Sequence, residues 1–243
     1  MLDKCTTISW ETSLYEPQQL YYNLMGEKIL TDKNVKSAYY MAKHKQSCDS
    51  PAWDGMTRTI LIDGMEQDQA WSLIRYHILH GPSDCVKRFD IPKSNGKTRP
   101  ISIYPLLDRV AQWCIMGPLS KACGPLLSPI NHAFQKGKSC KTAFEAFPPA
   151  GEAGYVICGD IHSFFDTVSH SLVRACLWSA GIRDSQLLHT INVTLKTPYK
   201  YPKQPKVRPE QGLPQGAPIS PLLANIILAY MDRYFVSLYG DQK

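Results

Sequence analysis

The chain has 243 residues, of which 44% are hydrophobic and 20% are charged. This composition supports a sizeable buried core and excludes a disordered polar tail or a fibrous repeat. The formal net charge of +6 is compatible with a polyanionic partner, but many ordinary enzymes carry as much, so charge alone does not establish nucleic-acid binding.

The eight cysteines are scattered through apolar segments, and none forms a Cys-x-x-Cys pair or a close Cys/His cluster with zinc-site spacing. The N-terminus lacks the apolar core of a secretory leader, and no apolar run reaches the roughly 18 residues of a membrane span. We therefore expect a soluble cytoplasmic protein with buried free thiols and no membrane partner.

The first third of the chain predicts helices separated by a loop. Residues 16–46 are typical of a moderately polar helix, whereas Pro, Asp and Gly close together in 50–57 indicate a loop. Apolar residues within 70–78 then recur at helical spacing, and Gly81 provides a stop signal.

Two strand-like runs follow, Val86–Pro92 and Thr98–Tyr104, and the segment between them contains Asn-Gly, a strong hairpin signal. The cations Lys93, Lys97 and Arg99 surround this turn. They are suited to a triphosphate, with Lys as a point charge and Arg as a planar fork, but Lys is also common at solvated hairpin tips. Both interpretations are open at this point.

Residues 106–120 carry apolar side chains on one helical face. Residues 155–160 (YVICGD) form an apolar run that ends on Asp160, which predicts a buried central strand that delivers a carboxylate. Two phenylalanines and Asp166 follow. Because Mg²⁺ prefers carboxylate and phosphate oxygens, this pattern suits a metal-dependent site. The alternative is that Asp160 caps a turn and the aromatics belong to the core.

Residues 170–180 and 184–195 are predicted helices, and 219–239 is a long apolar helix. Helices and strands alternate without clean βαβ units, so the class is mixed α and β rather than doubly wound. The connection 194–210 is rich in Pro and Lys, with tyrosines interleaved. Charge and aromatic stacking suit a nucleic acid, but a mobile solvated loop is equally compatible.

A Gly-rich, Pro-bounded loop opens the last helix. Ser220 is placed to cap that helix and Pro221 to occupy its first helical position. Gln215 and Gly216 precede them and are available to a ligand, since backbone amides at such a position bind anions.

In order and spacing, these blocks resemble the fingers and palm motifs of reverse transcriptases, most closely those encoded by group II introns. The blocks are DGMT (54–57), IPKSNGKTRPISI (91–103), LLDRVAQ (106–112), NHAFQKGKSCKTAF (131–144), GDIHSFFDTVSH (159–170) and GLPQGAPISPLLANI (212–226). The resemblance implies an α+β right-hand polymerase fold. Residues 1–150 would form an N-terminal extension and fingers, and 151–243 a partial palm.

The resemblance also implies roles for individual residues. Asp160 corresponds to the catalytic, first metal-binding aspartate of a two-Mg²⁺ site, and Phe165 to the aromatic that rejects a 2′-hydroxyl. The implied nucleotide-binding residues are Lys93, Arg99, Phe165, Gln215 and Gly216. The template- or RNA-binding residues are Lys136 and Lys138, which match a template-contacting block, and Lys200, Lys203 and Lys206 from the basic connection.

The family pattern continues with Tyr-x-Asp-Asp, which supplies further metal carboxylates, and no such motif occurs in the 243 residues. We therefore expect a fragment that is not a competent polymerase by itself, and a truncated palm that favours self-association. The complete protein is expected to be an RNA-directed DNA polymerase that binds template RNA, an RNA–DNA duplex, dNTP and group II intron RNA. The alternatives are an intron-RNA-binding maturase module and a related cellular reverse transcriptase in phage defence or spacer acquisition.

Overall fold

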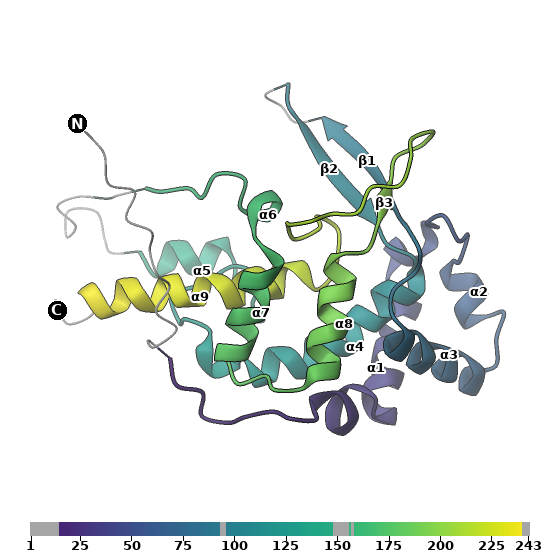
Figure 1. The fold of residues 1–243 in the computed structure, drawn as a ribbon, viewed down its shortest axis with the longest axis horizontal. Coiled ribbons are helices and arrows are strands. Elements are labelled where there is room, and N and C mark those ends of the chain that lie inside the picture. Colours follow the sequence, from purple (N-terminus) through teal and green to yellow (C-terminus); the bar gives the residue numbers. More distant parts are fainter. Residues whose placement is uncertain (1–14, 93–95, 148–155, 157, 240–243) are drawn as a thin grey trace.

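The computed structural model describes residues 15–92, 96–147, 156 and 158–239, and helices dominate them (Figure 1). The short helices η2, η3 and η4 are a π-helix and two 3₁₀ turns. In chain order the elements are η2 (Met25–Ile29), α1 (Asp32–His44), η3 (Gln46–Asp49), α2 (Arg58–Ile62), α3 (Gln67–His80), β1 (Val86–Pro92), β2 (Thr98–Ile103), α4 (Leu106–Ala122), η4 (Gly124–Leu126), α5 (Cys140–Glu145), α6 (Phe164–Thr167), α7 (His170–Ser179), α8 (Ser185–Leu195), β3 (Tyr199–Lys200) and α9 (Ser220–Tyr239).

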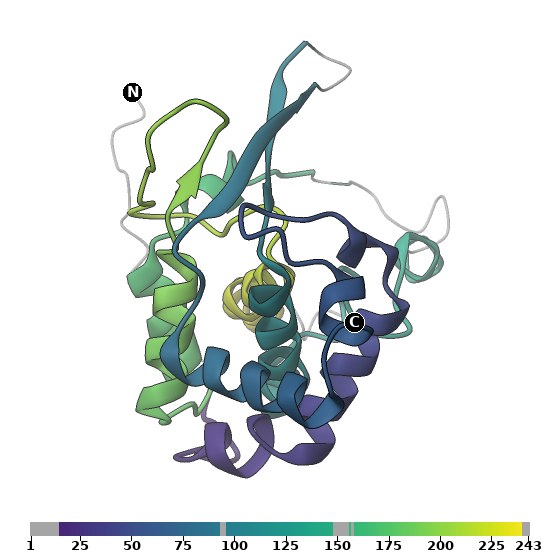
Figure 2. The ribbon, with the colours of Figure 1, turned by 90° about the vertical axis from the view of Figure 1, so that its right-hand side faces the viewer.

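The hydrophobic core is centred on α4, which packs against α1 and α3, while α9 packs against α7 (Figure 2). One cluster of buried side chains contains residues from Leu24 to Tyr230 and therefore draws on both sides of residue 150. The boundary predicted at 150/151 itself falls outside the described residues, so that division stays a prediction. None of the described helices combines the length and apolar character needed to cross a membrane.

The sheet has three strands in the order β2-β1-β3, and the predicted hairpin is confirmed. Strands β1 and β2 pair antiparallel, from Lys87 opposite Ile103 to Pro92 opposite Thr98. Strand β3 adds to β1 in parallel, with Lys87 opposite Lys200. The hairpin projects from the helical body (Figure 1), and β2 forms a free edge of the sheet.

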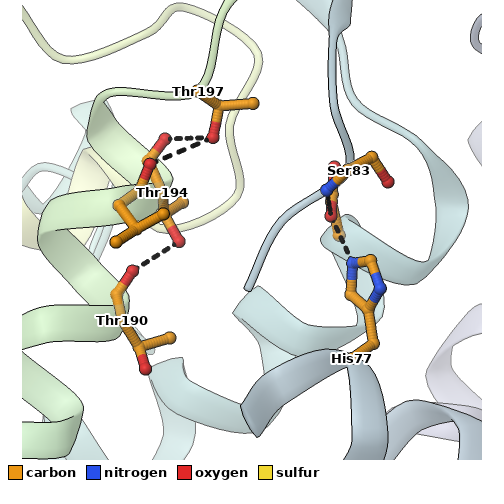
Figure 3. A network of polar contacts seen from close by, with 7 residues as sticks. His77, Ser83, Thr190, Thr194 and Thr197 are labelled. Carbon is orange, nitrogen blue, oxygen red and sulfur yellow. Dashed lines mark hydrogen bonds and ion pairs between the residues drawn. The ribbon is translucent and has the colours of Figure 1, made fainter. Parts of the chain in front are cut away.

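Two sets of polar contacts hold the segments that enter β1 and β3 (Figure 3). Before β1, the buried Asp108 carboxylate accepts from Ser83 N at 2.9 Å and pairs with His77. Before β3, the Thr197 hydroxyl, just beyond the end of α8, donates to Thr194 O at 2.9 Å. Because Val86 N donates to Pro198 O at 2.8 Å, the two segments meet where the strands begin.

The predicted helix over 16–46 is only partly correct, because the described helices begin after residue 23 and are broken between η2 and α1. The cause is tertiary. Tyr21 N donates to Gly181 O at 2.9 Å, and Arg183 N donates to Tyr21 O at 2.8 Å. This bridge to the α7–α8 turn uses the backbone groups that a helix at Tyr21 would need.

The predicted buried strand over 155–160 is wrong in its described part. Cys158, Gly159 and Asp160 are exposed and not in a strand, and Val156 is 57% exposed. Tyr155 and Ile157 lie outside the described residues. A strand requires a neighbouring strand for its hydrogen bonds, and the described sheet contains no strand beside this segment.

The described cysteines are free thiols, as expected, but they are not all buried. Cys140 and Cys158 are exposed, whereas burial raises the pKa of Cys114, Cys123 and Cys176 to about 12. Burial also raises the pKa of Cys48, so the four buried thiols stay protonated at neutral pH and act as small apolar side chains.

Candidate functional site

The loop before α9 lies along the free edge of β2. Ser102 N donates to Gln215 O at 2.8 Å, which extends the sheet edge by one contact. Gly216 adopts φ +106°, and a Cβ built there would lie 2.2 Å from Ser102 O. Glycine is therefore required at this position both by its backbone conformation and by the close approach of β2.

The hairpin cation and the loop amide predicted from the sequence are in contact. Arg99 Nε donates to Gln215 Oε1 at 2.7 Å, although the residues are 116 positions apart. Arg99 is exposed and Gln215 is half-buried. Arginine has five N–H donors, and this bond uses one of them, so the guanidinium is oriented by Gln215 while retaining capacity for an anion.

The same loop is fastened to α6, which carries Phe165. Leu213 N donates to Phe165 O at 2.6 Å, and Gly212 N donates to Val168 O at 2.7 Å. His170, which is buried at the start of α7, lies with Nε2 3.0 Å from Gly212 O. Burial lowers the pKa of His170, so the ring is neutral near pH 7 and donates from Nε2 to this carbonyl.

A cavity of about 320 Å³ lies between the base of the hairpin, α6 and residues 207–214. Phe165 of α6 lines this cavity. Ser102 of β2 and Tyr104, just after that strand, line it as well. Its volume is at the lower end of the range for small-ligand pockets. The hairpin, α6 and the loop before α9 therefore each contribute residues to one space, although Arg99, Gln215 and Gly216 do not line it themselves.

Arg88 also lines this cavity and was missed by the sequence analysis. Its guanidinium lies 4.1 Å from the centroid of the Tyr199 ring. Its Nε is buried without a hydrogen-bond partner among the described residues. The alternation of side chains along a strand could have predicted this position, because Arg88 lies two residues after the buried Val86 and therefore shares its face of β1.

Asp160 is exposed and precedes α6. Across 15–92, 96–147, 156 and 158–239, no group of three or more His, Cys, Asp or Glu side chains is arranged to hold a metal ion. The described residues therefore do not by themselves fit a two-Mg²⁺ site. Lys93, the other predicted triphosphate cation, lies outside the described residues.

The five predicted RNA-binding lysines belong to two segments, one before α5 and one that begins at β3, and these segments lie apart in both ribbon views (Figures 1 and 2). Lys136 is exposed beside α5, and Lys138 Nζ donates to Pro129 O. In the other group, Lys203 is exposed and Lys206 pairs with Asp84. The Asp84 carboxylate reduces the net positive charge that Lys206 offers to a phosphate.

The connection that carries Lys200, Lys203 and Lys206 folds back on itself. Tyr199 N donates to Val207 O, and Val207 N donates to Tyr199 O, both at 2.8 Å. The Tyr201 hydroxyl donates to Asp90 Oδ1 at 3.0 Å. These contacts attach the connection to the hairpin rather than leaving it a free solvated loop.

Asn225, on α9, holds the segment before α5 in place. It is 3% exposed, and its Nδ2 donates to Ala133 O at 2.8 Å. Its Oδ1 accepts from Asn131 Nδ2 at 3.1 Å. A lone Asn within an apolar helix was the sequence signal, but nothing local indicated its partner.

The sequence model of one family, described as "Reverse transcriptase (RNA-dependent DNA polymerase)", matches residues 91–238. The chain belongs to the reverse transcriptase family. The matched region contains β2, α6 and the loop before α9, which line the cavity together with β1 residues that precede Ile91.

Curated relatives extend the similarity to intron proteins. Protein YkfC of Escherichia coli (strain K12) is 30% identical over 202 residues, which cover 80% of this chain and 52% of that protein. The group II intron-encoded protein LtrA of Lactococcus lactis subsp. cremoris is 31% identical over 159 residues, covering 63% of this chain and 26% of LtrA. The putative COX1/OXI3 intron 1 protein of Saccharomyces cerevisiae is 31% identical over 162 residues, covering 65% of this chain and 19% of that protein. The chain thus spans between 19% and 52% of these three relatives.

Among solved structures, a chain of a partial Cas6-RT-Cas1–Cas2 complex superposes with a TM-score of 0.53 at 24% identity. The match covers 86% of this chain and 34% of that chain. At this identity the likeness concerns the fold alone. Together with the family match, it confirms the predicted α+β reverse transcriptase fold.

Proposed function

We propose that the chain is the nucleotide-gripping part of an RNA-directed DNA polymerase of the group II intron type. The contact between Arg99 and Gln215 supports this proposal most directly, because it joins the hairpin cation to the loop whose residues 212–214 line the cavity together with Phe165. The similarity to LtrA over 63% of the chain supports the group II type. The proposed ligands are template RNA, the RNA–DNA duplex, dNTP and group II intron RNA.

In this proposal each element has one task. Lys93 and Arg99 bind the triphosphate of the dNTP, and the loop at Gln215 and Gly216 forms the wall of the nucleotide pocket. The ring of Phe165 excludes a 2′-hydroxyl by steric contact with the sugar. Such residues act mainly by positioning the reactants and stabilising charge, which is most of what a protein contributes to phosphoryl transfer.

Asp160 is proposed as one metal-binding carboxylate of the complete polymerase. When bound, Mg²⁺ would neutralise phosphate charge and activate a primer hydroxyl. The 243 residues contain no Tyr-x-Asp-Asp motif, and the described ones build no metal cluster. We therefore propose that the 243 residues alone do not polymerise, and that other carboxylates complete the site in a longer protein.

The lysines Lys136, Lys138, Lys200, Lys203 and Lys206 are proposed to contact template or intron RNA. Lys136 and Lys203 are exposed and best placed for phosphates, whereas Lys206 must first release Asp84. Neutralising Lys200, Lys203 and Lys206 together should lower the affinity for RNA and flatten its dependence on salt.

The decisive experiment measures sugar discrimination in a complete polymerase that contains these residues. Phe165→Ala should reduce the preference for dNTP over rNTP, measured as the ratio of kcat/KM values, by about tenfold or more. Phe164→Ala is the matched control. Its ring contacts that of Phe165 at 5.9 Å between centroids but does not line the cavity. An unchanged ratio in Phe165→Ala would contradict the steric role.

Asp160→Ala tests the metal role in the same protein. Nucleotide incorporation should be lost, while RNA binding should be retained, because Asp160 is exposed and lies outside the helices and strands. Polymerisation at the original rate would show that Asp160 is not catalytic.

A further inference from the structure

Trp53 lies on the surface, in a loop that hydrogen bonds hold in place on both sides of it. The side chain is 45% exposed. After it, Asp54 Oδ1 accepts from Met56 N at 3.2 Å around Gly55, which adopts φ +70°. Before it, the buried Arg109 donates to Ser47 O at 2.6 Å and to Ser50 O at 3.3 Å. An exposed indole on a fixed turn is a rigid apolar surface with little entropy to lose on binding.

Two lysines flank this indole. Lys87 of β1 and Lys200 of β3 are register partners, so their side chains leave the same face of the sheet. Their Nζ atoms lie 5.6 and 5.8 Å from the centroid of the Trp53 ring. One aromatic surface is thus bordered by positive charge from two neighbouring strands.

Both Nζ atoms lie over the Trp53 ring, but at a longer distance than the cations over two other tryptophan rings. The Arg183 guanidinium lies 4.0 Å from the equally exposed Trp178 ring, and Lys36 Nζ lies 4.3 Å from that of Trp71. Near 6 Å the attraction between a cation and an indole is at its outer limit. The Lys87 and Lys200 ammonium groups are therefore available to a phosphate, while the indole is available to a planar group.

The same sheet face leads towards Arg99, the cation proposed to bind the triphosphate. Lys87, Phe89 and Ile91 alternate along β1, and Ile91 is the register partner of Arg99. At about 3.3 Å per residue, Ile91 lies about 13 Å along the strand from Lys87. A strand of nucleic acid held at Trp53 can therefore follow the sheet face towards Arg99.

We propose that Trp53, Lys87 and Lys200 form a binding site for single-stranded nucleic acid, in which an unpaired base stacks on the indole and the lysines contact the flanking phosphates. This inference rests on the proposed function and adds the place where an unpaired template is held. Single strands fit this chemistry because their bases expose a π-face, which bases inside a duplex do not.

The test uses a fluorescent RNA of about 12 nucleotides without self-complementarity, a length within the usual range for single-strand sites. Trp53→Ala should weaken binding about tenfold by fluorescence anisotropy, and Trp53→Phe should restore most of the affinity. The matched control is Trp178→Ala, which removes an indole that is 48% exposed but has a guanidinium on its ring. That control should bind like the unsubstituted protein.

Salt dependence separates stacking from charge. Trp53→Ala should leave the slope of log affinity against log salt unchanged, because indole carries no charge. Lys87→Gln and Lys200→Gln should each reduce the slope by about 0.7, the value expected for one phosphate contact on a single strand. A thermal unfolding curve for each variant separates these effects from misfolding.

The outcomes also distinguish this inference from the function on which it rests. If the protein binds no RNA at all, both are overturned. If it binds RNA and neither Trp53 variant differs from the unsubstituted protein, only the Trp53 site is overturned. An equal loss of affinity for a fully paired RNA duplex would also overturn it, since duplex bases cannot stack on Trp53.

Discussion

At the residue scale, the site depends on backbone positions that only glycine fills. Gly216 and Gly212 both adopt positive φ, and both would place a Cβ against a carbonyl oxygen of a neighbouring element. The two glycines therefore determine how closely the loop approaches β2 and α6, and with that the positions of Gln215 and Phe165.

Gly216→Ala should destabilise the protein by about 2 kcal/mol or more, because left-handed strain is added to a clash with Ser102 O. The control is Gly137→Ala. Gly137 adopts φ +78°, but its Cβ would have no atom within 4 Å, so about 1 kcal/mol of strain is expected. Urea unfolding measures both. If both variants lost the same free energy of unfolding, the close approach of Gly216 to β2 would make no contribution to stability.

His170 makes the stability of this loop depend on pH. Burial holds its folded pKa below the unfolded value of about 6.5, so below that pH the unfolded state binds more protons. The contribution of His170 to the free energy of unfolding should therefore be fully present above about pH 6.5. It should fall on acidification, by at most about 1.4 kcal/mol per pH unit.

The test is His170→Gln, which does not titrate and keeps an N–H donor for Gly212 O. The free energy of unfolding, measured at about pH 7.5 and about pH 5.5, should fall less in this variant than in the original protein. A loss of the same size in both would assign the acid sensitivity to other groups.

At the element scale, α4 organises the supports of the site through three buried polar side chains. Asp108 holds the entry to β1, Arg109 holds the loop that carries Trp53, and Gln112 Oε1 accepts from Ile219 N at the entry to α9 at 3.3 Å. The sequence predicted only an apolar face for α4. The structure shows that α4 also binds the entry to β1, the loop that carries Trp53 and the entry to α9.

Arg109→Met should destabilise the protein by about 2–3 kcal/mol, because the carbonyls of Ser47 and Ser50 lose a charged donor. Arg58→Met is the control. Arg58 pairs with Asp49 of the same segment at 2.9 Å but is partly exposed, so a loss below about 1 kcal/mol is expected. Acrylamide quenching should increase for Trp53 in the Arg109 variant only. Similar losses for both variants would contradict the anchoring role.

At the scale of the whole molecule, one hydrophobic cluster connects the N-terminal helices, α4 and α9. Such continuity predicts a single cooperative unfolding transition, in which circular dichroism and tryptophan fluorescence coincide along a urea titration. Two separated transitions would instead support independent units divided near residue 150. Phe164→Ala, used above as a control, should shift this transition without splitting it.

Local sequence patterns were sufficient to predict the hairpin and most helices. Asn-Gly between two strand-like runs predicts the turn between β1 and β2, and apolar spacing predicts α3, α4 and α9, because both signals act within a few residues. The ordered motifs around Arg99, Phe165 and Gln215 were sufficient to indicate the reverse transcriptase family, which the family match confirms.

Only the tertiary structure decided how these parts meet. The bond between Arg99 and Gln215, the orientation of Arg88 into the cavity and the pairing of Lys87 with Lys200 beside Trp53 join residues that are distant in sequence. The segment 155–160 illustrates the same limit, since an apolar run becomes a strand only beside another strand. Hydrogen bonding and burial between distant segments depend on packing of the whole chain, and that packing leaves no mark within a short window of sequence.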